Sequence, residues 1–288
     1  MSHLRLNMAL AWLLLAGCTG GAGGAGGAQA TDVSSHAGPV RADTTVTSPN
    51  APPLQPPGAD SVLRLISEVD GDGALSYPLD NGATVNFWYG LTFNVQGQTY
   101  YTGFAWFSPA VLGPQQVDYP DPARQAVLAQ ATFVLGEDAQ APWRWEGSEL
   151  AIGPFGSHGR GNAVDAHGQA QTLPLHNGDL LLAVPSLQDL PGETGRALEI
   201  LHFRAALPTA VEDRRWRHLG TLQTGSDNTA SCGQANPRIA CRTVHGVVRF
   251  IEEPGQRFPV ISVAYPDTGV EAAVEYRYDA GSRTYQPT

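Results

Sequence analysis

The stretch from Phe87 to Phe107 constrains the fold most, because large apolar residues alternate in it with smaller or polar ones. A period of two is typical of a β-strand that buries one face. Gln96-Gly97 predicts a two-residue turn and therefore an antiparallel hairpin, although Gln96 is poorly suited to the positive φ of such a turn. The expected register brings three aromatic pairs together on one face: Phe93 with Tyr100, Tyr89 with Phe104, and Phe87 with Trp106. A slip of one residue would break every pair, so the core itself specifies the register.

Similar short β-rich runs, separated by Gly, Pro, Asn and Asp, continue to the end of the chain. A second hairpin is expected around Pro266-Asp267-Thr268-Gly269, pairing Tyr265 with Val270, Val263 with Ala272 and Ile261 with Val274. Further strands are expected at Val62 to Val69, Ala126 to Leu135, Trp143 to Ile152, Leu180 to Val184, Trp216 to Leu222, Val244 to Ile251 and Arg277 to Tyr285. Ala197 to Ala206 fits a strand or a short helix.

Residues 61–288 are therefore expected to form an all-β globular domain with little helix. Its architecture would be an antiparallel sandwich, a barrel or a small propeller of about ten or more strands. The length also permits two packed halves that meet near Pro185 to Pro191.

Residues 18–60 differ sharply from this pattern. The segment begins with repeated Gly-Gly-Ala, ends in a Pro-rich run, and has almost no large apolar residue between them. Such a composition buries too little surface to offset chain entropy, so a disordered tether is expected. A flexible chain of the 42 residues from Thr19 to Asp60 would span about 35 Å root-mean-square.

Residues 1–17 have the organisation of a secretory leader. Arg5 supplies the positive charge, Met8 to Leu15 form a short apolar run, and Leu15-Ala16-Gly17-Cys18 follows. This last tetrapeptide resembles the lipobox of bacterial lipoproteins. The resemblance implies cleavage before Cys18, addition of lipid to that cysteine and, with Thr19 next to it, anchoring in the outer membrane, facing the periplasm. The alternative, an uncleaved membrane helix, would need about 20 apolar residues.

The charge of the remaining chain narrows the class of partner. The full sequence has 17 basic and 27 acidic residues, and residues 1–17 contain one arginine and no acid, so residues 18–288 carry 16 − 27 = −11. Nucleic acid is not an expected partner, because binding it requires a basic surface. A cationic protein would be attracted by the same charge.

Three cysteines are present, and lipid on Cys18 would leave Cys232 and Cys241. An exported domain lies in an oxidising compartment, so a disulfide between these two is expected. Closing a loop of about ten residues stabilises a fold by roughly 2.5 to 3 kcal/mol in the chain-entropy model. A metal pair is the alternative, but neither a CxxC motif nor a nearby pair of histidines supports it.

Four residues form a candidate zinc site: His158, Asp165, His167 and His176. The histidines recur every nine residues, and imidazole with carboxylate is a suitable ligand set for zinc. No H-E-x-x-H motif occurs, and the segment is rich in glycine, which favours exposed histidines without a metal.

A candidate ligand-binding surface comes from the aromatic residues of the hairpin that do not belong to the three expected pairs. Trp88, Tyr101 and Phe107 would point away from the paired face, around Gly90 and Gly103, which the register places opposite each other. Such rings beside bare glycines could stack a sugar or seat a side chain of a partner. The alternative is that another strand or loop covers them.

Three functions follow from these features. The first is a lipid-anchored envelope protein whose β domain binds a macromolecular partner of the envelope, a protein or a glycan with a protein favoured, as an inhibitor or immunity protein would. The second is a metal-dependent hydrolase built on the histidine cluster, and the third is a module that binds cell wall or polysaccharide. We favour the first, expect no cofactor, and identify no catalytic residue in the sequence.

Overall fold

The structure of the protein is a computed structural model that describes residues 54–110, 121–210, 213–233, 238–266 and 273–288. The leader, Cys18, most of the expected tether and the centre of the second expected turn lie outside these residues. Pro52–Thr288 form one compact unit. Within the described residues, no helix has the length and apolar character needed to cross a membrane.

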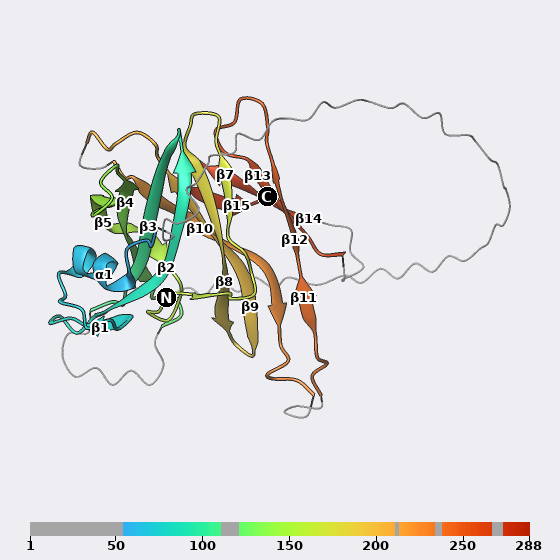
Figure 1. Ribbon diagram of the computed structural model, residues 1–288. Helices are drawn as coiled ribbons and strands as arrows, with labels where there is room; N and C mark the ends of the chain where they lie inside the picture. The colour runs from blue at the N-terminus through green and yellow to red at the C-terminus, as the bar shows by residue number, and fades with distance from the viewer. Residues whose placement is uncertain (1–53, 111–120, 211–212, 234–237, 267–272) are drawn as a thin grey trace, which may run out of the picture. The chain divides into compact units, whose positions relative to one another are not determined.

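Three antiparallel sheets make up this unit (Figure 1). The first sheet has the order β1 (Ser76–Pro78), β2 (Thr84–Val95), β3 (Gln98–Phe107), β4 (Ala126–Leu135), β5 (Trp143–Phe155). The middle sheet has the order β11 (Thr243–His245), β10 (Trp216–Asp227), β9 (Glu193–Phe203), β8 (Leu180–Leu190), β6 (Ala163–Val164), and β7 (Gln171–Pro174) also pairs with β8. The third sheet has the order β12 (Val247–Ile251), β13 (Val260–Ala264), β14 (Ala273–Asp279), β15 (Thr284–Pro287). The predicted all-β antiparallel fold is confirmed, and the described strands form a layered sandwich without a closed barrel.

The middle sheet is covered on both faces, which explains its continuous apolar runs. Leu182 and Leu201 belong to a core shared with the first sheet, whereas Leu181 and Ile200 belong to a core shared with the third sheet. Successive residues of a strand point to opposite faces. A strand between two cores therefore has no polar face, and a period of two is absent from Leu180 to Val184.

The predicted hairpin is present as β2 and β3, with one correction. Gln96 and Gly97 have φ of 52° and 78°, as a type I′ turn requires, and Phe93 and Tyr89 face Tyr100 and Phe104 as expected. Beyond Tyr89 a β-bulge at Trp88 shifts the register, so the third expected pair was wrong: Phe87 faces Ala105, and Asn86 faces Trp106. Because a bulge adds one residue to one strand, it moves Trp88 to the other face.

The expected strand at Val62 to Val69 is instead α1 (Ala59–Ser67). Its buried residues Val62, Leu63 and Ile66 follow helical spacing and cover the outer face of the first sheet. The prediction failed because a short apolar run fits either period. The chain approaches this helix along β5, where Trp143 Nε1 donates a hydrogen bond to the carbonyl of Gln55 at 3.0 Å.

The third sheet corrects two further expectations. Val263 faces Val274 and Ile261 faces Tyr276, so each partner lies two residues further along the chain than predicted, while the same faces remain paired. Arg277 to Tyr285 does not form one strand but spans the turn between β14 and β15. The segment Ala197 to Ala206 resolves as strand β9 up to Phe203, and Pro185 lies inside β8.

Candidate functional site

The three predicted aromatic residues do not form a surface. Trp88, moved by the bulge, is buried between the first and middle sheets and donates a hydrogen bond from Nε1 to the carbonyl of Asn162 at 2.8 Å. Tyr101 is buried on the opposite face under α1, with Phe107 partly buried beside that core. A side chain at Gly103 would collide with Val62 of the helix, so the glycine there serves the packing of α1.

The predicted zinc ligands are also kept apart by other partners. Asp165 is buried and accepts a charged hydrogen bond from Arg196 Nη1 at 2.8 Å, and also one from the backbone N–H of His167. His176 lies on the surface with its Nε2 3.3 Å from Glu252. His158 lies in a tight turn with a φ of 53°. Among the residues that the structure describes, no group of three or more His, Cys, Asp or Glu is placed to hold a metal ion.

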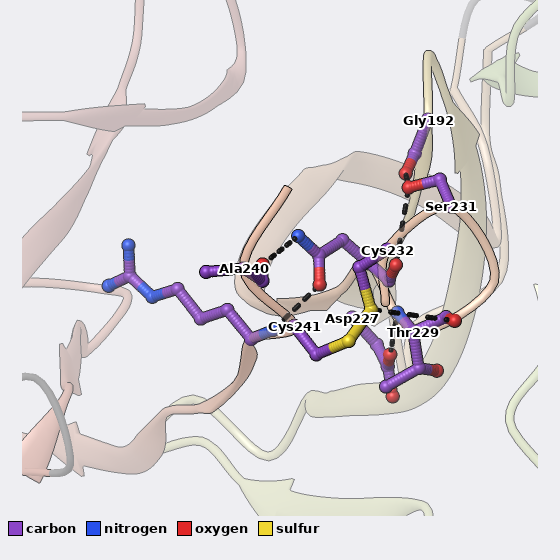
Figure 2. The surroundings of a disulfide bond; sticks show 9 residues. Gly192, Asp227, Thr229, Ser231, Cys232, Ala240 and Cys241 are labelled. Atoms are coloured by element: carbon purple, nitrogen blue, oxygen red, sulfur yellow. Dashed lines mark hydrogen bonds between the residues drawn. A yellow bond between two sulfur atoms is a disulfide. The ribbon is translucent and has the colours of Figure 1, made fainter. Parts of the chain in front are cut away.

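The predicted disulfide between Cys232 and Cys241 is confirmed (Figure 2). It closes a loop that follows β10, and Asn228 fastens both sides of this loop. The Nδ2 of Asn228 donates to the carbonyl of Ala240, and its Oδ1 accepts from the N–H of Arg242 at 2.7 Å. The hydroxyl of Ser231 donates to the carbonyl of Gly192, which fastens the loop to the turn between β8 and β9.

The structure reveals a site that the sequence did not indicate: a pocket of about 270 Å³ between β5 and the segment that leads into β10. Its walls come from β4, from the middle of β5, and from residues 207–208 and 213–215. The lining residues are Gln130, Thr132, Glu146, Gly147, Ser148, Glu149, Leu207, Pro208, Asp213, Arg214 and Arg215. We refer to this feature as the β5 pocket.

Two irregularities in the pairing of β4 with β5 shape the β5 pocket. The register shifts between Thr132 and Phe133, where Glu146 has no partner of its own, and again between Leu128 and Gln130, just beyond Glu149. Bulges of this kind redirect side chains and are common next to functional sites. Here they interrupt the period of two and give two carboxylates, three residues apart, to one pocket.

Glu149 holds the start of β10 in place. Its Oε1 accepts a hydrogen bond from the backbone N–H of Arg215 at 2.6 Å, and its Oε2 accepts from the N–H of Trp216 at 2.9 Å. The Nε2 of Gln130 donates a third hydrogen bond at 3.0 Å. This carboxylate is therefore fixed by three donors that are all uncharged groups.

Arg215 closes the inner end of the pocket and is only 5% exposed. Its guanidinium lies 4.6 Å from the ring centre of Phe203 and 5.5 Å from that of Tyr100. The Nη2 atom is 2.8 Å from Glu146 Oε2, whereas Nε and Nη1 are buried without a hydrogen-bond partner in the described residues. Stacking on aromatic faces and pairing with Glu146 together offset the cost of burying this charge.

A chain of hydrogen bonds connects the pocket to the core. Trp216 Nε1 lies 3.2 Å from the hydroxyls of both Thr102 and Thr132, and the Thr132 hydroxyl donates to Gln130 Oε1 at 2.6 Å. All four side chains are buried. A satisfied polar network of this kind fixes side-chain positions, so the floor of the pocket is rigid before any ligand arrives.

Exposed apolar side chains lie on both sides of the pocket residues of β5. Trp145 is 50% exposed and Leu150 is 58% exposed, and they flank the stretch from Glu146 to Glu149 in the sequence. Leu207, on the opposite wall, is 58% exposed. Trp145 pairs with Phe133, which packs in the core under α1, whereas Thr132 lines the pocket on the other face of the sheet. Leu207 is thus an exposed apolar side chain on the pocket wall itself, and Trp145 adds to the exposed apolar surface of β5. Exposed apolar residues near a preformed pocket are typical of surfaces that bind another molecule.

Elsewhere, the middle sheet buries two histidine–carboxylate pairs, one on each face. On the face toward the first sheet, Glu199 is fully buried and accepts four hydrogen bonds, from Asn162, Ser186, Thr221 and His218, at 2.7 to 2.9 Å. Burial acts to raise the pKa of Glu199. The hydrogen bond and charge of His218, with the other donors, outweigh burial and hold the pKa below its usual value.

On the face toward the third sheet, Asp179 Oδ2 lies 2.9 Å from His202 Nε2 and 3.0 Å from Arg257 Nη2. Burial opposes ionisation of Asp179, but the N–H of Ala205 and the donors Arg257, Asn177 and His202 lower its pKa overall. His202 packs edge-on against Phe258, with ring centres 5.0 Å apart. Burial lowers the pKa of His202 to about 4, so the imidazole is neutral at pH 7.

Comparison with protein-family models, with curated proteins and with solved structures finds no match for this chain. A weak sequence signal for the pocket existed, since Glu149 occupies a position in register with Trp143 and Trp145, where the alternation calls for an apolar residue. The second half of the pocket, residues 207–208 and 213–215, comes next to these residues only through the tertiary fold.

Proposed function

We propose that this chain is a lipoprotein of the cell envelope, anchored through Cys18, whose β domain binds a protein partner over β5 and the β5 pocket. The anchor is inferred from the resemblance of residues 15–18 to a lipobox. Several acyl chains on one residue would hold the chain on a membrane, since each buried methylene contributes about 0.8 kcal/mol. The Gly- and Pro-rich segment that follows would allow the domain to reach a partner at a distance from the lipid.

The observation that carries the proposal is the preformed pocket with an exposed apolar side chain, Leu207, on its wall. Binding energy at protein interfaces is concentrated where a side chain of one partner fills a pocket surrounded by apolar contacts. Leu207 supplies such a contact at the pocket, and Trp145 and Leu150 are further exposed apolar side chains on β5, the strand that carries the pocket's two glutamates. The pocket supplies a preformed position for an anchoring side chain.

The chemistry of the pocket suits binding better than catalysis. Its lining residues include neither histidine nor cysteine, and Glu149 is immobilised by three hydrogen bonds. The negative charge of the chain would increase the rate of association with a cationic protein. One such partner is a cationic enzyme that attacks the envelope, for which this chain would serve as an inhibitor or immunity protein.

Site-specific photo-crosslinking in intact cells tests this function. A photo-reactive amino acid in place of Trp145, or of Leu150, should yield a discrete adduct with one protein. The matched control is the same amino acid in place of Leu75, which is equally exposed at 58% but lies outside β5. Adducts at Leu75 and Trp145 alike, or at neither β5 position, would contradict the proposal.

The anchor is tested separately by mass spectrometry of the mature chain. The expected amino terminus is Cys18 with added lipid, and Cys18→Ser should release the chain into the soluble fraction. An unmodified amino terminus upstream of residue 18 would rule out the lipid anchor.

A further inference from the structure

The side-chain donors that line the β5 pocket are directed at acceptors of the protein itself. Gln130 donates to Glu149, Thr132 donates to Gln130, and Ser148 donates to the carbonyl of Leu65. Arg214 donates to the carbonyls of Ala151 and Asp213. The Nε and Nη1 atoms of Arg215 are buried without a hydrogen-bond partner in the described residues, and Oε2 of Glu146 is buried in the same way. A ligand that needs hydrogen-bond donors, such as an anion, would find few to engage here.

The carboxylates of the pocket, in contrast, keep acceptor positions that no donor uses. An ionised carboxylate offers about four acceptor positions. The hydrogen bonds to Glu149 use three of these positions, all with uncharged donors, and Oε2 of Glu146 is buried 2.8 Å from Arg215 Nη2. Asp213 is paired with Arg204 at 2.9 Å. The pocket therefore complements a group that donates hydrogen bonds and carries positive charge.

The shape of the β5 pocket restricts the size of that group. Its volume of about 270 Å³ is below the usual range of about 300 to 1,000 Å³ for small-molecule sites. Leu207 and Pro208 provide an apolar wall, and a side chain built at Gly147 would meet nothing within 4 Å. An apolar wall leading to carboxylates suits a methylene chain that ends in a cation.

We infer that the β5 pocket receives a single lysine or arginine side chain from a basic segment of the partner protein. The inference rests on the proposed function and specifies the chemistry of the contact. The aliphatic part of the side chain would pack against Leu207 and Pro208. Its ammonium or guanidinium group would donate hydrogen bonds to Glu149 and to the Oε1 atom of Glu146. The charge of −11 on residues 18–288 would attract such a segment from a distance.

The test compares small probes bound to the purified full-length protein, with affinities measured by ligand-observed NMR. N-acetyl-lysine amide and N-acetyl-arginine amide should bind about ten-fold more tightly than N-acetyl-norleucine amide, a difference of about 1.4 kcal/mol, because the neutral probe cannot make a charged hydrogen bond. N-acetyl-norleucine amide has a similar chain without the charge. Equal binding of the neutral probe, or preferred binding of N-acetyl-glutamate amide, would overturn the inference.

Filling the pocket provides the second half of the test. Gly147→Leu should abolish binding of the lysine probe, whereas Gly136→Leu, at an exposed glycine outside the pocket, should leave binding unchanged. If Gly147→Leu fails to fold, Gly147→Ala should still weaken binding several-fold. Unchanged affinity in the folded variants would place the probe elsewhere and refute the assignment.

The two levels of the proposal fail separately. Crosslinks at Trp145 without a preference for cationic probes would retain the docking surface and reject the cationic occupant. Cationic probes that bind in the pocket without any crosslink in cells would retain the pocket chemistry and reject the docking function.

Discussion

The two histidine–carboxylate pairs of the middle sheet contain the same chemical groups but differ in their surroundings. Glu199 and His218 are sealed between two sheets, and every other hydrogen bond to the carboxylate comes from a neutral side chain. Asp179 and His202 lie near the rim of the other core, where Arg257 joins them with its side chain 53% exposed. The difference teaches that a buried carboxylate can be held either by many neutral donors or by a nearby cation that remains in contact with water.

The largest effect is expected from removing the charge of Glu199. Glu199→Gln should reduce the free energy of unfolding by about 3 to 5 kcal/mol, because the negative charge is lost and an NH2 group replaces one oxygen, so that two of the four donors face another donor. Asp179→Asn, the matched change in the other pair, should cost about 1 to 3 kcal/mol, since Arg257 can turn to solvent. Denaturant unfolding at pH 7 compares the two variants, and equal losses would show that the surroundings do not matter.

The second effect is a pH dependence of the free energy of unfolding that is expected from the Asp179–His202 pair. Because the pKa of His202 falls from 6.5 to about 4 on folding, the unfolded chain binds a proton in that range and the folded chain does not. The contribution of His202 to the free energy of unfolding is fully present above pH 6.5. The free energy of unfolding should decline by about 3 kcal/mol as the pH falls toward 4.

His202→Gln should remove this part of the pH profile of unfolding while leaving the further loss at lower pH. That further loss comes from carboxylates with lowered pKa values, such as Asp179, whose contribution disappears only below about pH 3.8. A variant that keeps the full slope between pH 6.5 and 4 would show that His202 is not its source.

The smallest effect is expected at Arg257, the exposed cation beside Asp179 and His202. Arg257→Gln should lower the free energy of unfolding by less than about 1 kcal/mol, because half-exposed ion pairs are screened by water and salt. High salt should reduce the difference between wild type and variant further. A loss of several kcal/mol in the free energy of unfolding, insensitive to salt, would contradict this prediction. It would indicate that Asp179 depends on Arg257 as strongly as the buried Glu199 depends on His218.

Local pattern and local turn chemistry account for the elements that the sequence predicted well. The β2–β3 hairpin and the boundaries of β4 follow from alternation and a glycine turn. The bulge at Trp88 was not predicted, because the alternating pattern continues through it in the sequence. Helix α1 was not predicted, because its apolar run is too short to distinguish the period of a helix from that of a strand.

The candidate site was less accessible to sequence reasoning for a different reason. Glu149 and Arg215 are 66 residues apart, and only the packing of β5 beside β10 brings them together. A buried arginine on aromatic rings has no local signature. The aromatic residues chosen from the sequence were conspicuous because they form a core, whereas Trp145 is the one that reaches solvent.

The hydrogen bond between Gln55 and Trp143 has a mechanical consequence. It fastens the chain that comes from the amino-terminal side to β5, and Ser148 of the same strand bonds to α1. If lipid held the amino-terminal side and a docked protein held β5, a pull between them would act on β5 directly. Helix α1 also packs against β2, β3 and β4, so these strands would share the force with β5.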